Sequence, residues 1–176
     1  MEVEPTYHQI RQNPYGKTNQ SEMRDCILDT CILSCPFGHI GECRGKIMDK
    51  TYNIEAKGQD KYFCEDLNIG DIIVIVFKID GSDKKYNQVS LRNCIVARII
   101  SKPIDLAETN HFISNSTNKK INISKIKTKG SLPFRPIGRR IEIIESNLEL
   151  IGDRKKYFSM KSIMPLFDTT KQKISL

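Results

Sequence analysis

Six consecutive apolar residues, Ile72–Phe77, constrain the fold of this chain more than any other segment. Five of the six are β-branched, which favours an extended strand over a helix. Turn-forming residues bound the run on both sides, at 67–71 with its Gly-Asp pair and at 80–83 with its Asp-Gly-Ser-Asp sequence. Because the run is apolar on both of its faces, it predicts a buried strand at the centre of a sheet. It is far too short to span a membrane.

Weaker patterns predict the elements around this strand. Ser21 followed by acidic residues suits a helix start, and apolar residues then recur at intervals of four. The segment 30–35 fits a short buried strand or a continuation of that helix, and we favour the strand. The expected elements are a helix or turn at 21–29, a strand at 30–35, a helical turn at 61–68 and strands at 93–100, 139–144 and 163–167.

Several strands, few helices and loops of uneven length predict an α+β fold, a small mixed β-barrel with a few short helices. At 176 residues the chain suits one domain. We expect this domain to span residues 21–168, with a basic insertion at 109–140. Residues 1–20 read as a polar N-terminal arm and residues 169–176 as a polar tail.

Two segments resemble the PUA-like superfamily, which includes the EVE, YTH and ASCH domains. They are the Gly-Asp turn with its strand at 70–77 and the apolar-Ala-Arg pattern at 95–99, within a similarity covering about 61–104. The resemblance implies a β-barrel that binds RNA or a modified base, yet this chain has none of the tryptophans that form the methyl-base cage. A base pocket at the barrel mouth would use Phe37, Phe77 and Arg98. Arg98 could instead lie on a solvated sheet face, since an inward arginine needs a carboxylate or ligand.

The stretch 109–141 contains eight basic residues and no acidic one, whereas the whole chain carries a formal charge of +7. A block of positive charge attracts polyanions. Binding of nucleic acid to such a block is favoured by the release of counterions from the phosphates. The predicted nucleic-acid-binding residues are Lys119, Lys120, Lys125, Lys127, Lys129, Arg135, Arg139 and Arg140. The arginines lie beside Phe134 on a Pro/Gly-containing segment, which suits a clamp on phosphates or bases. A solvated surface loop is the competing interpretation.

Four residues of types that bind zinc lie close in sequence: Cys31, Cys35, His39 and Cys43. If 30–35 is a strand, Cys31 and Cys35 are about 13 Å apart and cannot share one ion. We therefore favour buried thiols without a cofactor over a zinc site, which stays open as the alternative. The first residues contain no apolar signal segment, so we expect reduced thiols and a cytoplasmic or nuclear protein.

No phosphate loop, nucleophile elbow, dinucleotide fingerprint or deaminase signature occurs in the sequence. Enzymatic activity is therefore the less favoured reading, and no catalytic residue is predicted. The leading hypothesis is a nucleic-acid-binding module, of RNA or DNA. The alternatives are a structural, assembly or transcription-associated subunit, in the manner of viral proteins, that docks a protein partner through its basic segment, or a zinc-binding factor.

Overall fold

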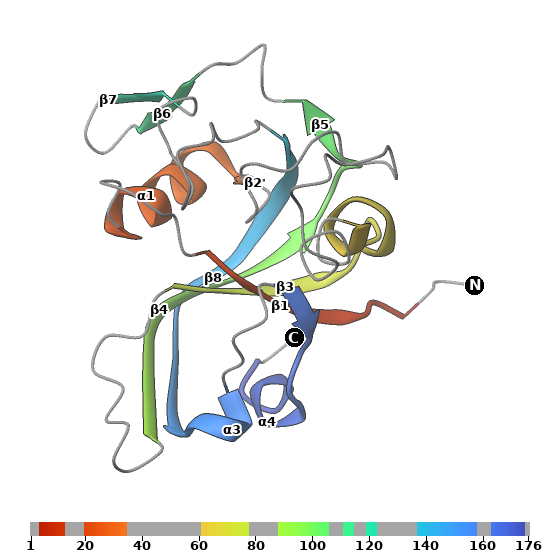
Figure 1. Ribbon diagram of the computed structural model, residues 1–176, viewed down its shortest axis with the longest axis vertical. Helices are drawn as coiled ribbons and strands as arrows, with labels where there is room; N and C mark the ends of the chain where they lie inside the picture. The colour runs from red at the N-terminus through yellow and green to blue at the C-terminus, as the bar shows by residue number, and fades with distance from the viewer. Residues whose placement is uncertain are drawn as a thin grey trace, which may run out of the picture.

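The computed structural model describes residues 4–12, 20–34, 61–77, 88–105, 111–114, 119–122, 137–157 and 163–174. Its main sheet curls into a half-barrel (Figure 1). Along the sheet the strands follow the order β2 (Ile32–Ser34), β8 (Ile137–Asp153), β4 (Gln88–Ile99), β3 (Ile72–Val76), β1 (Tyr7–Arg11) and β9 (Ile163–Pro165). The short strand β5 (Ile104–Asp105) also pairs with β8. Only β1 and β3 run parallel among these described pairs.

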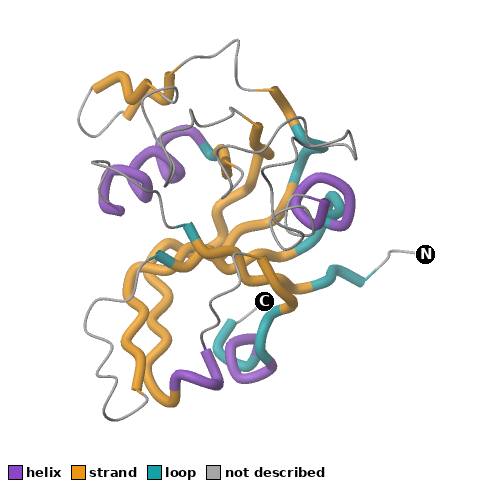
Figure 2. The backbone as a smooth tube through the Cα atoms, in the orientation of Figure 1, coloured by secondary structure: helices purple, strands orange, loops and turns teal. Residues whose placement is uncertain are grey.

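Short helices cover both faces of this sheet (Figure 2). On one side lie α1 (Gln20–Thr30) and the two-stranded hairpin of β6 (His111–Ser114) and β7 (Lys119–Asn122); on the opposite side lie α3 (Arg154–Tyr157) and α4 (Asp168–Lys171) (Figure 1). A single π-helical turn, η1 (Tyr62–Asp66), precedes the Gly-Asp turn. The fold is thus mostly sheet with a few short helices, and it is compatible with the small mixed barrel expected from the sequence.

Strand β3 is buried along its whole length, which confirms the predicted central strand. Ile73 and Ile75 point into a first core, while Ile72, Val74 and Val76 belong to a second core on the other face. Hydrogen bonding to β1 on one side and β4 on the other satisfies the backbone of the strand. The uninterrupted apolar run is therefore the consequence of packing on both faces.

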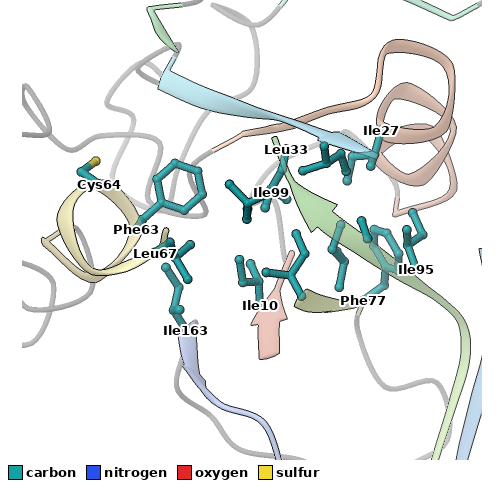
Figure 3. Packing of buried hydrophobic residues seen from close by; sticks show 14 residues of the cluster. Ile10, Ile27, Leu33, Phe63, Cys64, Leu67, Phe77, Ile95, Ile99 and Ile163 are labelled. Atoms are coloured by element: carbon teal, nitrogen blue, oxygen red, sulfur yellow. The ribbon is translucent and has the colours of Figure 1, made fainter. Parts of the chain in front are cut away.

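The first core joins α1, η1 and both edge strands to the centre of the sheet (Figure 3). Figure 3 shows ten of its members labelled: Ile10, Ile27, Leu33, Phe63, Cys64, Leu67, Phe77, Ile95, Ile99 and Ile163. The second core lies under α3 and α4, and its members include Val89, Leu91, Cys94, Val96, Leu148, Leu150, Tyr157, Leu166 and Ile174.

The long β4–β8 ribbon is irregular in its middle, where the pairing register shifts between Leu91 and Ala97. Asn93 adopts a left-handed conformation there, with φ of 56°. Arg24 of α1 reaches this irregularity and donates hydrogen bonds to the carbonyls of Asn93 and Ser146, at 3.1 and 2.6 Å. The irregularity thus allows side chains of the ribbon to pack into both cores. The hydrogen bonds from Arg24 hold α1 against the ribbon.

Both chain ends differ from the sequence expectation. Residues 7–11 lie inside the sheet as β1, where a polar arm over 1–20 is expected, and Ile174 of the expected tail is buried in the second core. The sequence pattern does not predict β1, because His8 and Gln9 are polar and such residues seldom lie in a buried strand. In the structure both are buried. The predicted strands at 93–100 and 139–144 are confirmed within β4 and β8, and those at 30–35 and 163–167 are confirmed in part, as the shorter strands β2 and β9.

A basic surface and a buried polar cluster

The described part of the basic stretch begins on the small hairpin and ends on β8. Lys119 and Lys120 form the start of β7, opposite Ser114 and Ile113. Arg139 and Arg140 lie in the first residues of β8, next to β2. The remaining predicted contacts, Lys125, Lys127, Lys129 and Arg135, lie outside the described residues.

Arg139 is buried, which corrects its predicted role as a surface phosphate ligand. Its side chain is 2% exposed and lies 5.8 Å from the centre of the Phe63 ring. The guanidinium donates three hydrogen bonds to backbone carbonyls, those of Phe63 at 2.9 Å, Cys64 at 3.0 Å and Ser101 at 3.1 Å. Burial lowers the pKa of Arg139, and the charge of Asp71 acts in the opposite direction. The guanidinium therefore holds η1 against β8 through its hydrogen bonds to Phe63 and Cys64.

Arg140, the next residue, points the other way. It is exposed, as the alternation of a strand requires for a neighbour of a buried residue. Its carbonyl accepts a hydrogen bond of 3.0 Å from the backbone N–H of Ile100, and its own N–H donates to Ser101 Oγ at 2.8 Å. Of the two adjacent arginines, only Arg140 offers its side chain to a ligand at the surface.

The predicted base pocket does not form from Phe77 and Arg98. Phe77 is buried in the first core, on the same face as Ile73 and Ile75. Arg98 is directly opposite Ile72, a residue of the second core, so its side chain leaves the other face of the sheet. There it is exposed and forms an ion pair of 2.8 Å with Glu142, which matches the solvated alternative for Arg98. Phe37 lies outside the described residues.

Of the predicted zinc ligands, the structure describes Cys31, which directly follows α1 with φ of 51° and is a half-buried free thiol. Cys35, His39 and Cys43 lie outside the described residues, so the zinc site stays a prediction. Within the described ranges, no three His, Cys, Asp or Glu side chains gather as metal ligands.

Two further cysteines, Cys94 and Cys64, differ in state. Cys94 is free, and burial raises the pKa of its thiol to about 12, so it behaves as an apolar core residue. Cys64 is disulfide-bonded. The expectation of reduced thiols therefore holds for Cys31 and Cys94 and fails for Cys64.

A polar cluster lies where β1 and β3 begin; it consists of the buried His8 and Asp71, the half-buried Tyr62 and the exposed Thr6. Gly70 takes a left-handed φ of 98°, and the following Asp71 turns its carboxylate inward. One carboxylate oxygen accepts hydrogen bonds from the Thr6 hydroxyl at 2.6 Å and the Thr6 N–H at 3.2 Å. The other accepts from the Asn68 N–H at 2.7 Å and lies 3.2 Å from His8 Nε2. The Gly-Asp turn thus ties the first strand to the third.

The hydrogen bonds of the cluster fix the tautomer of His8. Because the Thr6 hydroxyl donates its proton to Asp71, its oxygen accepts from His8 Nε2, 2.8 Å away. The proton of the neutral ring is therefore on Nε2, and Nδ1 accepts a hydrogen bond of 2.8 Å from the Tyr62 hydroxyl. Tyr62 belongs to η1, so the cluster joins three segments far apart in the sequence.

The electrostatics of the cluster keep each group in one protonation state. Burial lowers the pKa of His8, partly offset by Asp71, so the neutral ring is favoured. Burial together with Asp66 and Asp71 raises the pKa of Tyr62, so its hydroxyl keeps its proton. Burial alone would raise the pKa of Asp71, but hydrogen bonds from Thr6 and Asn68 hold it below its usual value. A tyrosine that retains its proton is a poor nucleophile, so the array suits bracing of the fold better than covalent catalysis.

The lowered pKa of His8 predicts a loss of stability on mild acidification. The unfolded chain takes up the proton near the ordinary pKa of 6.5, whereas the folded chain takes it up at lower pH. The free energy of unfolding should therefore fall as the pH drops below about 6.5. Urea unfolding at pH 7.5 and 5.5 measures this fall, and His8→Gln should show less of it. An equal pH dependence in the two proteins would assign the effect to other groups.

Sequence reasoning missed His8, Thr6 and Tyr62 as parts of one cluster. The available signal was the Gly-Asp pair, which marked the turn without showing what its carboxylate contacts. No protein-family model matches the chain, and no curated protein sequence matches it significantly. Across the described ranges, none of the helices combines the length and apolar character needed to cross a bilayer.

Proposed function

We propose that this protein is a non-catalytic nucleic-acid-binding module with a PUA-like barrel, which holds phosphates through the basic stretch 109–141. The observation that carries the proposal is the charge of that stretch, eight basic residues without an acidic one, of which the buried Arg139 is not available to phosphates. Counterion release from phosphates supplies binding free energy for such a block irrespective of sequence. The similarity of residues 61–104 to PUA-like domains supports the same class of ligand.

The arrangement of the described residues is consistent with one binding surface. The β6–β7 hairpin, which carries Lys119 and Lys120, lies at the same end of the molecule as the start of β8, which carries Arg140 (Figure 1). The two ends of the basic stretch therefore lie on one side of the fold. Phosphates bound along it position a strand without selecting its bases.

The double variant Lys119→Ala/Lys120→Ala should weaken nucleic-acid binding and its salt dependence. Each lost phosphate contact lowers the slope of log K against log salt by about 0.9 on duplex and about 0.7 on single strands. The matched control is Lys155→Ala/Lys156→Ala, which removes two consecutive lysines from α3 at the opposite end of the molecule. Fluorescence anisotropy with short RNA and DNA, single- and double-stranded, at several salt concentrations measures both quantities.

If the two double variants lose equal affinity and slope, net charge alone drives binding and the proposed surface is wrong. If the wild-type protein binds neither RNA nor DNA at low salt, the proposed function fails. Binding of an acidic protein partner would then be the next reading of the basic stretch.

A further inference from the structure

Two isoleucines and one arginine, all exposed, lie at the end of the sheet where β3 begins and β4 ends. Ile69 is 59% exposed and Ile100 is 49% exposed. The hydrogen bond of 2.8 Å from Gly70 N–H to the Ile99 carbonyl holds the backbone next to Ile69 against the backbone next to Ile100. The hydrogen bond from Ile100 N–H to the Arg140 carbonyl places Arg140 beside Ile100. We name Ile69, Ile100 and Arg140 the isoleucine–arginine row.

Ile100 and Arg140 continue a sheet face that is covered elsewhere. Ile72 and Val96 on that face are buried in the second core, which also contains Tyr157 of α3. Arg98 then marks the end of the covered part, where it pairs with Glu142 at the surface. Beyond this ion pair, Ile100 and Ile69 are open to solvent. The two exposed isoleucines leave apolar surface in contact with water, and the described helices do not cover it.

We propose that the isoleucine–arginine row contacts the bases of a single-stranded nucleic acid, an inference that rests on the proposed function. Arg140 is both the last basic residue of the stretch 109–141 and a member of the row, so a phosphate bound by Arg140 lies beside Ile100. The guanidinium offers a cation to the adjacent phosphate or a flat face to a base. The isoleucines offer apolar contact to base faces, which an unpaired strand exposes and a duplex hides by stacking.

Three variants separate the roles within this row. Ile69→Ser/Ile100→Ser should weaken binding of a single-stranded oligouridylate of about 12 nucleotides by roughly fivefold to tenfold, at an unchanged salt slope. Arg140→Ala should lower both the affinity and the slope, the latter by somewhat under one. The matched control is Ile151→Ser, since Ile151 is 51% exposed on β8 at the far end of the ribbon. The control should bind as the wild type does.

The same titrations with a duplex of about 12 base pairs test the contact with bases. The double isoleucine variant should bind duplex as tightly as the wild type. Equal losses on duplex and single strand, or no loss on either, would overturn the inference. If Lys119→Ala/Lys120→Ala still weakens binding in that case, the proposed function stands without the row. Urea unfolding of each variant checks that the surface changes leave the unfolding midpoint where the wild type has it.

Discussion

Replacing Arg139 with methionine should lower the free energy of unfolding by about 3 kcal/mol or more. The arginine is 2% exposed and donates to three backbone carbonyls, of Phe63, Cys64 and Ser101. Each hydrogen bond from a charged donor contributes about 1.5–3 kcal/mol, and a carbonyl left buried without a donor adds its own penalty. Methionine fills much of the volume but satisfies none of the three. The result should be loosening of η1 from β8.

Urea or thermal unfolding followed by circular dichroism measures this effect, and Arg140→Met is the matched control. The neighbouring arginine is exposed, so its replacement should change stability by about 0.5 kcal/mol or less. If both variants are equally stable, the carbonyl contacts of Arg139 contribute nothing measurable. The contrast also matters for binding studies, since a double Arg139/Arg140 variant would report a damaged fold together with a lost phosphate contact.

The pair Arg139-Arg140 illustrates why the sequence predicted the strands better than the site. Apolar content alone identified β3, because five β-branched residues in a row suit a strand packed on both faces. Alternation along a strand predicts that adjacent residues point to opposite faces, yet charge alone assigns both arginines to the surface. Only the tertiary contact with the carbonyls of η1 distinguishes the buried arginine from the exposed one.

The same limit applies to strand β1 and to the base pocket. His8 and Gln9 are polar, and burial of His8 depends on Asp71, which is 63 residues away in the chain. No local pattern carries that information. Phe77 and Arg98 were placed together by the resemblance, but the register of β3 with β4 sends them to opposite faces. Pairing across strands, rather than residue type, decides which side chains meet.

Replacing Asp71 with alanine should lower the free energy of unfolding by about 3 kcal/mol or more. The carboxylate accepts from the Thr6 hydroxyl, the Thr6 N–H and the Asn68 N–H, and it lies next to His8. Alanine removes the shared acceptor of these hydrogen bonds, and water can replace it in part because Thr6 and Asn68 are exposed residues. It also removes the tie between β1 and the Gly-Asp turn. Asp66→Ala is the matched control, because Asp66 is an exposed carboxylate on the preceding turn η1.

The pKa of Asp71 gives this prediction a second, independent signature. Because the folded state holds that pKa below the ordinary value of 3.8, the carboxylate stabilises the protein above that pH. The contribution should disappear as the pH falls through the folded pKa, so the difference in unfolding free energy between wild type and Asp71→Ala should narrow in acid. Hydrogen exchange of the β1 amides should accelerate in the variant at neutral pH, while the β4 amides opposite β8 change less. A variant with wild-type stability and unchanged exchange in β1 would mean that the first strand is held by its apolar contacts alone.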